Sequence, residues 1–242
     1  MITIDPNFNK NKLKLMKMAT ELVATTVLTQ WYAIETQDGL VSILWYPFQE
    51  SKEYGVAVHV CTMPRPKCLA STVLVYGEGR KNARCKHTQW IKDRVPIENY
   101  MEHLIQTRGE SIHEVLLSEA AEGDERLLLE GLITNFFVVK DGQLVTAGTN
   151  VLEGSTRELV LKACRDLSIP VVFQAPKLSE RHLWQAAFVT SAVRIVVDVT
   201  RLLCEEKHGE HVVLQETLIP SDKSEFTKRI RDQILMQRMY LK

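Results

Sequence analysis

The sequence from Leu129 to Thr146 is LEGLITNFFVVKDGQLVT. Its apolar runs are rich in Phe and Val, which favour strands, and one carboxylate, Glu130, interrupts them. The Asp-Gly pair at residues 141 and 142 is typical of a two-residue hairpin turn. This stretch therefore predicts three consecutive strands, at 126–129, 135–139 and 143–146.

Upstream of this stretch, β-rich runs separated by Gly, Pro and charged residues predict strands at 22–32, 40–48, 56–63, 71–76 and 114–117. We expect the first four to form a sheet of mostly antiparallel strands. Two prolines in the stretch from Pro64 to Cys68 interrupt strand pairing and predict a linker or a crossover. The predicted domains are a small N-terminal domain, residues 1–66, and a larger one, residues 67–242.

Downstream, Gly154-Ser155-Thr156-Arg157 precedes apolar residues at helical spacing. This pattern predicts a helix to about Leu167 with Ser or Thr as its cap. The other predicted elements are strands 171–174, 187–190 and 193–199, a short helix 179–186 with Ser179 as cap, and a C-terminal helix 223–241. This mixture predicts an α+β (mixed α/β) fold.

The composition argues against several kinds of partner. Thirty Lys and Arg balance thirty Asp and Glu, so no overall field attracts nucleic acid or an anionic membrane. No apolar stretch approaches the roughly 20 residues of a membrane-spanning helix, and the first residues resemble no secretory signal. Five widely spaced cysteines favour reduced thiols over disulfides or a metal site. We expect a cytoplasmic protein that acts on a small molecule and binds no metal.

Two segments in the first half of the larger domain could carry chemistry. The loop 77–94, GEGRKNARCKHTQWIKDR, holds six Lys or Arg residues and alone is most often a solvated basic loop. Glu130, between apolar strands, should be partly buried and then needs a partner. Backbone amides and a protonated heterocyclic nitrogen would serve equally well.

Two later segments are suited to binding an anion. Ser155 and Thr156 stand at a helix start, where free amides and the helix dipole favour negative charge. Thr190 and Ser191 supply two hydroxyls at the end of an apolar strand. Each feature is common alone, and a helix-start Ser or Thr is usually only a cap.

The order of these segments is more specific than any one of them. A lysine after a strand is followed by EGxxTNFFVVKDGxLVT, by GSTRELVL and by a strand ending in TSA. This order resembles the fold-type IV pyridoxal-phosphate (PLP) enzymes, the class IV aminotransferase family of branched-chain and D-amino-acid aminotransferases and aminodeoxychorismate lyases. The resemblance covers roughly residues 71–199. Plant-type branched-chain aminotransferase-like proteins are especially similar, with a GxGR…K…W…R segment that is Gly77, Gly79, Arg80, Lys86, Trp90 and Arg94 here.

The resemblance implies a fold-type IV enzyme with PLP as cofactor and assigns roles around the cofactor ring. Lys86 would form the Schiff base with the PLP aldehyde and move the proton between substrate and cofactor. Glu130 would pair with the pyridinium nitrogen, so that the ring can take up electrons. Thr134 and Asn135 would shape the ring pocket.

The resemblance also assigns the phosphate side of the site. The helix-start amides at Ser155 and Thr156 would hold the cofactor phosphate. Thr190 and Ser191 resemble the family's phosphate-side and substrate-side hydroxyls. Homodimers are typical of the family, which builds its sites near a subunit interface.

One part of the family pattern has no match in this sequence. Members normally begin with a longer small domain that contains an arginine for the cofactor phosphate. By this resemblance, residues before Leu22 would correspond to a late helix of that domain, so we expect a truncated N-terminal domain, as a short homologue or as the product of an alternative start. Arg80 or Arg84 could supply the missing charge.

The favoured function is therefore PLP-dependent transamination between an amino acid and a 2-oxo acid. A PLP-dependent lyase of the same family and a non-catalytic homologue with a degraded active site stay open. Nucleic-acid binding through the basic loop from Arg80 to Arg94 is disfavoured, because no aromatic platform or basic helix face accompanies it.

Overall fold

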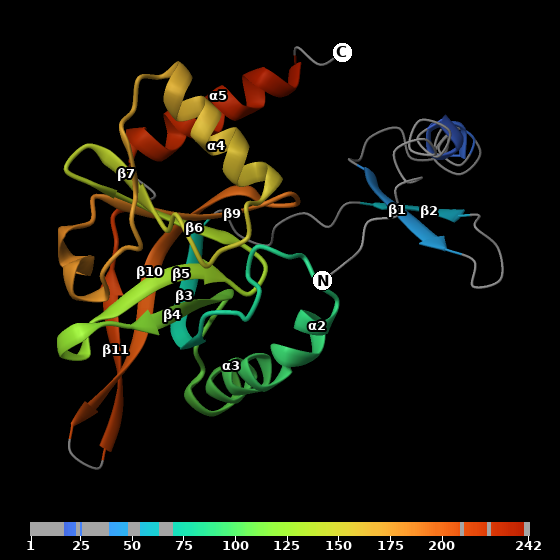
Figure 1. Ribbon diagram of the computed structural model, residues 1–242. Coiled ribbons are helices and arrows are strands. Elements are labelled where there is room, and N and C mark those ends of the chain that lie inside the picture. Colours follow the sequence, from blue (N-terminus) through green and yellow to red (C-terminus); the bar gives the residue numbers. More distant parts are fainter. Residues whose placement is uncertain are drawn as a thin grey trace. The chain divides into compact units, whose positions relative to one another are not determined.

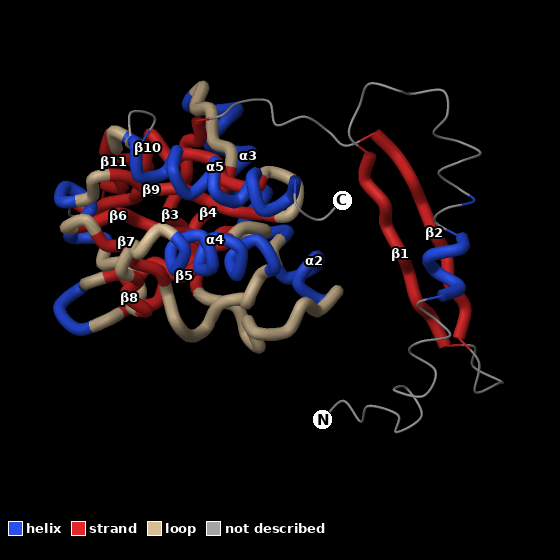
Figure 2. Tube along the Cα trace, turned by 90° about the horizontal axis from the view of Figure 1, so that it is seen from above, coloured by secondary structure: helices blue, strands red, loops and turns tan. Residues whose placement is uncertain are grey.

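The computed structural model describes residues 17–22, 25, 39–47, 54–62, 70–208, 211–221 and 224–239. The chain divides into two compact units, Met1–Arg65 and Pro66–Lys242. In the first unit, residues 17–22 are helical. Strands β1 (Gly39–Pro47) and β2 (Tyr54–Thr62) form an antiparallel hairpin, shown in Figure 2.

Two predictions for the N-terminal part are wrong. The strand predicted at 22–32 fails at its start, because Leu22 and Thr25 are helical, and residues 26–32 lie outside the described residues. The four early strands also do not form one sheet, since β1 pairs with β2 whereas β3 (Ala70–Glu78) belongs to the second unit. The predicted linker, 64–68, lies outside the described residues.

The second unit contains a nine-stranded mixed sheet and several helices (Figure 1). Its strands after β3 are β4 (Glu114–Ala120), β5 (Arg126–Gly131), β6 (Asn135–Lys140), β7 (Gln143–Thr146), β8 (Val171–Phe173), β9 (Ala186–Ser191), β10 (Ile195–His208) and β11 (His211–Leu218). Its α-helices are α2 (Gln89–Asp93), α3 (Val95–Arg108), α4 (Ser155–Asp166) and α5 (Glu225–Met239), and its 3-10 helices are η1 (Glu122–Asp124) and η2 (Leu178–Leu183). The predicted mixture of helices and strands is confirmed.

Six of these strands close into a ring. The pairings run β10–β3–β4–β5–β6–β9, and β9 pairs again with β10. Strand β3 is parallel to both of its neighbours, whereas the other pairings in the ring are antiparallel. The ring brings segments that are distant in sequence to one end of the sheet.

Alternation along β6 shows how the ring is packed. Phe136 and Val138 lie in a core with residues of β3, β5 and β10, while Phe137 and Val139 lie in another core with residues of α4 and α5. Successive side chains of a strand point to opposite faces, so the FFVV run serves both cores. Helix α3 packs elsewhere, with Leu104 in a cluster with residues of β3 and β4.

The predicted hairpin is confirmed in detail. Strands β6 and β7 pair antiparallel, and Lys140 pairs with Gln143. Asp141 and Gly142 both have positive φ, 52° and 70°, which a type I′ turn requires and which Asp and Gly tolerate. This turn fixes the register of both strands.

Several elements differ from the predictions at their ends. Helix α4 is confirmed, but its N-cap is Gly154 and no side chain caps it. The segment predicted as a helix capped by Ser179 is the 3-10 helix η2, whose N-cap is Lys177. Helix α3 and strand β11 were not predicted. None of the described helices is long and apolar enough to span a membrane.

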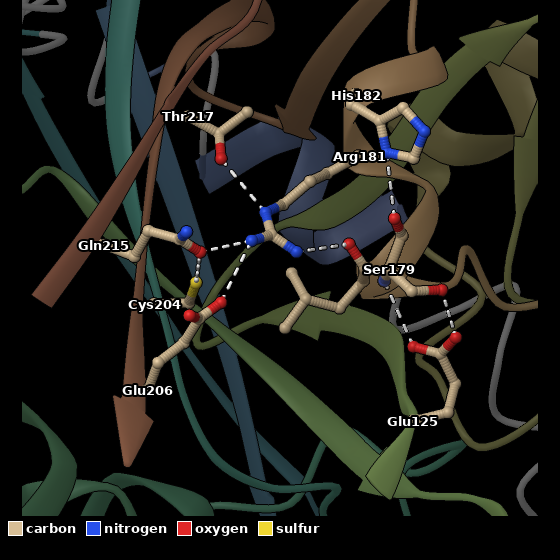
Figure 3. Close-up of polar contacts among 9 residues, drawn as sticks. Glu125, Ser179, Arg181, His182, Cys204, Glu206, Gln215 and Thr217 are labelled. Carbon is tan, nitrogen blue, oxygen red and sulfur yellow. Dashed lines mark hydrogen bonds and ion pairs between the residues drawn. The ribbon is translucent and has the colours of Figure 1, made fainter. Parts of the chain in front are cut away.

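A polar network joins η2 to the β10–β11 hairpin (Figure 3). The guanidinium of Arg181 donates to Thr217, Gln215 and Glu206 of the hairpin and to the carbonyl of Leu178. These bonds hold η2 to the hairpin.

Candidate active site

One end of the strand ring gathers several predicted site residues. Strand β5 ends just after Glu130 and β6 begins at Asn135, and these two residues are register partners. Asn135 also pairs with Thr190, near the end of β9. The side-chain amide nitrogen of Asn135, Nδ2, donates to the Leu152 carbonyl at 2.7 Å, which brings the segment before α4 to the same place.

Glu130 is a buried carboxylate, with 3% of its surface exposed. Its Oε1 accepts hydrogen bonds from Arg80 at 2.8 Å, and its Oε2 accepts one from the Leu152 amide at 2.9 Å. Burial raises the pKa of Glu130, while the Leu152 amide, the Arg80 guanidinium and the Lys86 charge oppose that rise. The partners of this carboxylate are thus one cation and one backbone amide.

The loop that carries Lys86 is anchored at its beginning. The Arg80 guanidinium donates to the Ala83 carbonyl at 2.7 Å and lies 5.3 Å from the centre of the Trp90 ring. Trp90 Nε1 donates to the Leu132 carbonyl, at 2.8 Å, in the turn after Glu130. Lys86 is exposed, yet its charge acts on Glu130. The loop therefore presents an accessible amine near a buried carboxylate.

The two arginines that could have supplied charge to a phosphate have different environments. Arg80 is buried and engaged by Glu130, with only 7% of its side chain exposed. Arg84 forms an ion pair with Glu153, and both side chains are largely exposed. Arg80 is thus part of the candidate site through its bond to Glu130. The pattern of six basic residues in the sequence did not separate Arg80 from the other five.

The start of α4 supplies free amide donors beside this cluster. The first amides of a helix have no partner within the helix, and no side chain caps α4. A Cβ atom on Gly154 would lie 2.5 Å from Asn135 Oδ1, so only glycine permits this close packing. Thr156 is buried and Ser155 is exposed.

The hydroxyl of Thr190 is an unsatisfied polar group. Thr190 Oγ1 is fully buried and makes no hydrogen bond, an arrangement that costs free energy unless a ligand supplies the partner. The neighbouring Ser191 Oγ accepts a hydrogen bond from the Arg194 amide at 3.1 Å. The two hydroxyls therefore differ: that of Thr190 is available to a ligand, and that of Ser191 already holds a turn.

Thr134 lies in the turn between β5 and β6, and its hydroxyl donates to Glu114 at 3.0 Å. Glu114 is itself buried, with 4% of its surface exposed, and sequence reasoning did not single it out. A carboxylate at the first position of an apolar strand looks like a solvent-exposed strand end, so the pattern gave no signal for its burial.

A cavity of about 360 Å³ lies beside Arg80. Its lining includes Arg80, Glu119, Leu129 and Asn150 but neither Lys86 nor Glu130. Leu129 and Glu130 are consecutive in β5, so their side chains point to opposite faces of the strand. The candidate site is therefore defined by the side-chain cluster rather than by this cavity.

Comparison with known proteins finds similarity to aminotransferases. The family model for amino-transferase class IV matches residues 32–202. A curated protein from Thermotoga maritima, described as "Probable branched-chain-amino-acid aminotransferase", is 37% identical over 89 residues. Those residues are 36% of this chain and 30% of that protein, so the match spans less than a third of the relative's length.

Solved structures share the fold at low sequence identity. The fold IV transaminase CpuTA1 from Curtobacterium pusillum has a TM-score of 0.65 and 16% identity, over 91% of this chain and 71% of its own. An aminotransferase from Brucella abortus, bound to PLP, has a TM-score of 0.58 and 17% identity, over 90% and 74%.

The chain belongs to the class IV aminotransferase family, since the family model covers more than half of it. The predicted family and the predicted fold-type IV architecture are thereby confirmed.

Proposed function

We propose that this protein is a PLP-dependent aminotransferase that transfers an amino group between an amino acid and a 2-oxo acid. Membership of the class IV family supports the activity, and the PLP-bound Brucella abortus structure supports the cofactor. The single observation that carries the proposal is the buried Glu130 carboxylate, with an accessible lysine near it and a helix start beside it.

The described residues fit this cofactor. Thr190 has a buried hydroxyl without a partner, and α4 has free amides at a start that no side chain caps. Glu130 offers a buried negative charge for a protonated ring nitrogen, although Arg80 already shares that charge. An anionic group at α4 and a cationic nitrogen at Glu130 match the two charged ends of PLP.

Each residue then has a defined task. When bound, PLP supplies an aldehyde that bonds to amines and a ring that takes up electrons. Lys86 would supply the amine and move a proton at the substrate Cα, and the Ser155 and Thr156 amides would bind the phosphate. Glu130 would accept a hydrogen bond from the ring nitrogen, and Asn135 would line the ring pocket.

The three remaining predicted residues have less direct tasks. Thr190 would donate its free hydroxyl to the phosphate or to the substrate. Ser191 would orient the turn next to it, because its hydroxyl already accepts the Arg194 amide. Thr134 would act from the turn below the ring pocket, where its hydroxyl holds Glu114.

Borohydride reduction of the protein incubated with PLP tests the proposal. Peptide mass mapping should find the reduced cofactor on Lys86, and the purified protein should exchange amino groups between branched-chain amino acids and 2-oxoglutarate. Lys81→Ala is the matched control for the assignment of the adduct to Lys86, because Lys81 is an exposed lysine of the same loop. A protein that remains unmodified and without absorbance above 300 nm would support the non-catalytic homologue instead.

A homodimer in the cytoplasm and a domain boundary at residue 66 complete the proposal. Family membership supports the dimer, and the compact unit that begins at Pro66 supports the boundary. Light scattering measures the mass of the purified protein in solution, and a monomer would contradict the proposed homodimer. Limited proteolysis should cut near residue 66, and a first cut inside β3–β11 would contradict the proposed domain boundary.

A further inference from the structure

The turn between β5 and β6 decides where two site residues stand. Glu130 precedes it and Asn135 follows it, so any change in the turn moves both. The β5–β6 ladder contains a single register pair, Glu130 with Asn135. Two backbone hydrogen bonds add to this pair, from the Gly131 amide to the Thr134 carbonyl at 2.8 Å and from the Leu132 amide to the Val115 carbonyl at 3.1 Å. Side-chain contacts supplement these few backbone bonds.

The Glu114 carboxyl supplies contacts from below the turn. Its Oε1 accepts hydrogen bonds from the amides of Val115, at 3.0 Å, and Leu132, at 3.1 Å. Its Oε2 accepts one from Thr134 Oγ1 at 3.0 Å. Glu114 thus joins its own strand, β4, to two positions of the turn.

Gly131 leaves the space in which this carboxyl lies. A Cβ atom on Gly131 would be 2.8 Å from the Glu114 Cδ and 2.1 Å from Thr134 Oγ1. The glycine is therefore required for close approach rather than for an unusual backbone angle. Glu114 and Gly131 form one packed unit directly beside Glu130.

The described hydrogen bonds of Glu114 do not require a negative charge on its carboxyl. None of its three hydrogen bonds comes from a cation, and burial raises the pKa of Glu114, against the Val115 amide, the Thr134 hydroxyl and the Arg194 charge. A glutamine could replace every bond, because its oxygen would accept both amides and its nitrogen would donate to Thr134.

We propose that Glu114 is a positioning residue: its carboxyl holds the Gly131–Thr134 turn and thereby sets Glu130 and Asn135 for the cofactor. The proposal rests on the proposed function for its last step. It predicts that the shape of the side chain matters and its charge does not.

Three variants separate shape from charge. Glu114→Gln keeps the bonds and removes the charge, Glu114→Ala removes both, and Thr134→Val removes only the turn-side donor. Glu119→Gln is the matched control, because Glu119 lies on the same strand and accepts a hydrogen bond from Asn150 instead. Thr134→Val also serves if Glu114→Ala fails to fold.

The first readouts use the cofactor-free protein. The Leu132 amide also donates to the Val115 carbonyl, so its hydrogen exchange should accelerate by about three- to tenfold in Glu114→Ala and by a smaller factor in Thr134→Val, which keeps the bond to Glu114. It should stay unchanged in Glu114→Gln and Glu119→Gln. The Glu130 carboxyl, followed by carbon NMR, should titrate at lower pH in Glu114→Ala than in Glu114→Gln, because a loosened turn exposes it. Unchanged Leu132 exchange in both loosening variants would overturn the proposal.

The second readout is the PLP dissociation constant from an absorbance titration. It should rise by about tenfold in Glu114→Ala and by less than about threefold in Glu114→Gln. A Gln variant as weak as the Ala variant would overturn the proposal, because charge would then be the requirement. If the unmodified protein binds no PLP, the proposed function fails, while Leu132 exchange and Glu130 titration still decide whether Glu114 holds the turn.

Discussion

The network around Arg181 and the cluster around Glu130 are both polar, but they differ in how completely their groups are paired. Every nitrogen of the Arg181 guanidinium donates to a partner. Figure 3 shows the bonds to Thr217, Gln215 and Glu206 of the β10–β11 hairpin, and the Leu178 carbonyl of η2 accepts another. In the candidate site, by contrast, Thr190 Oγ1 is buried without a partner and the start of α4 is uncapped. The Arg181 network holds elements together, whereas the candidate site leaves hydrogen-bonding groups free for a ligand.

The largest effect is expected when the exposed amine of Lys86 is removed from the candidate site. Lys86→Ala should lower the aminotransferase rate by about 10²–10⁴-fold, the usual contribution of a positioned acid or base, without changing the thermal midpoint. Rates with a branched-chain amino acid and 2-oxoglutarate measure the effect. A rate within a factor of three of the unmodified protein would show that another residue moves the proton.

The next test breaks the buried ion pair of the site. Arg80→Gln should lower the free energy of unfolding by about 3–5 kcal/mol, because it leaves the Glu130 carboxylate buried without a cation. Arg84→Gln, the control in the same loop, should cost about 0–1 kcal/mol, since that pair with Glu153 is exposed. Urea unfolding measures both, and equal losses would contradict the assigned difference in burial.

A smaller effect is expected in the saturated network. Arg181→Met should lower the free energy of unfolding by about 1–3 kcal/mol, because it removes the hydrogen bonds that join η2 to the β10–β11 hairpin. It should leave PLP affinity unchanged. Weaker PLP binding in this variant would mean that the two regions are coupled and that the contrast between holding and binding is too simple.

The smallest expected change has the opposite sign. Thr190→Val replaces an unpaired buried hydroxyl with a methyl group of similar shape, so the cofactor-free protein should gain up to about 1 kcal/mol in the free energy of unfolding. PLP affinity should fall at the same time. Calorimetry with and without PLP tests both parts, and a loss of stability without PLP would show that the hydroxyl is satisfied after all.

Local sequence signals were sufficient for the strands nearest the site. The Asp-Gly pair at residues 141 and 142 fixed the β6–β7 hairpin, and polar contrast with its apolar neighbours singled out Glu130. The order of motifs then indicated the family. These features were predictable because each depends on a few adjacent residues.

Features that depend on distant segments were missed. Six basic residues follow β3, and nothing in their pattern shows that Arg80 turns inward to Glu130 while Arg84 stays exposed. Glu114 is buried and bonded to the β5–β6 turn, whose residues lie 18 and 20 positions further along the chain. Helix α3, however, had local signals that went unused: a proline near its start and Gly109, with φ of 67°, at its end.

The pairing of β3 with β10 also bears on how the protein is made. Ala70 pairs with Asp198, and these residues lie more than half of the chain apart. During synthesis on a ribosome, β3 can meet β4 early, but its other edge has no partner until β10 has emerged. Ring closure is then a late folding step, and an interrupted chain that ends before β10 would expose a long, apolar β3 edge that favours aggregation.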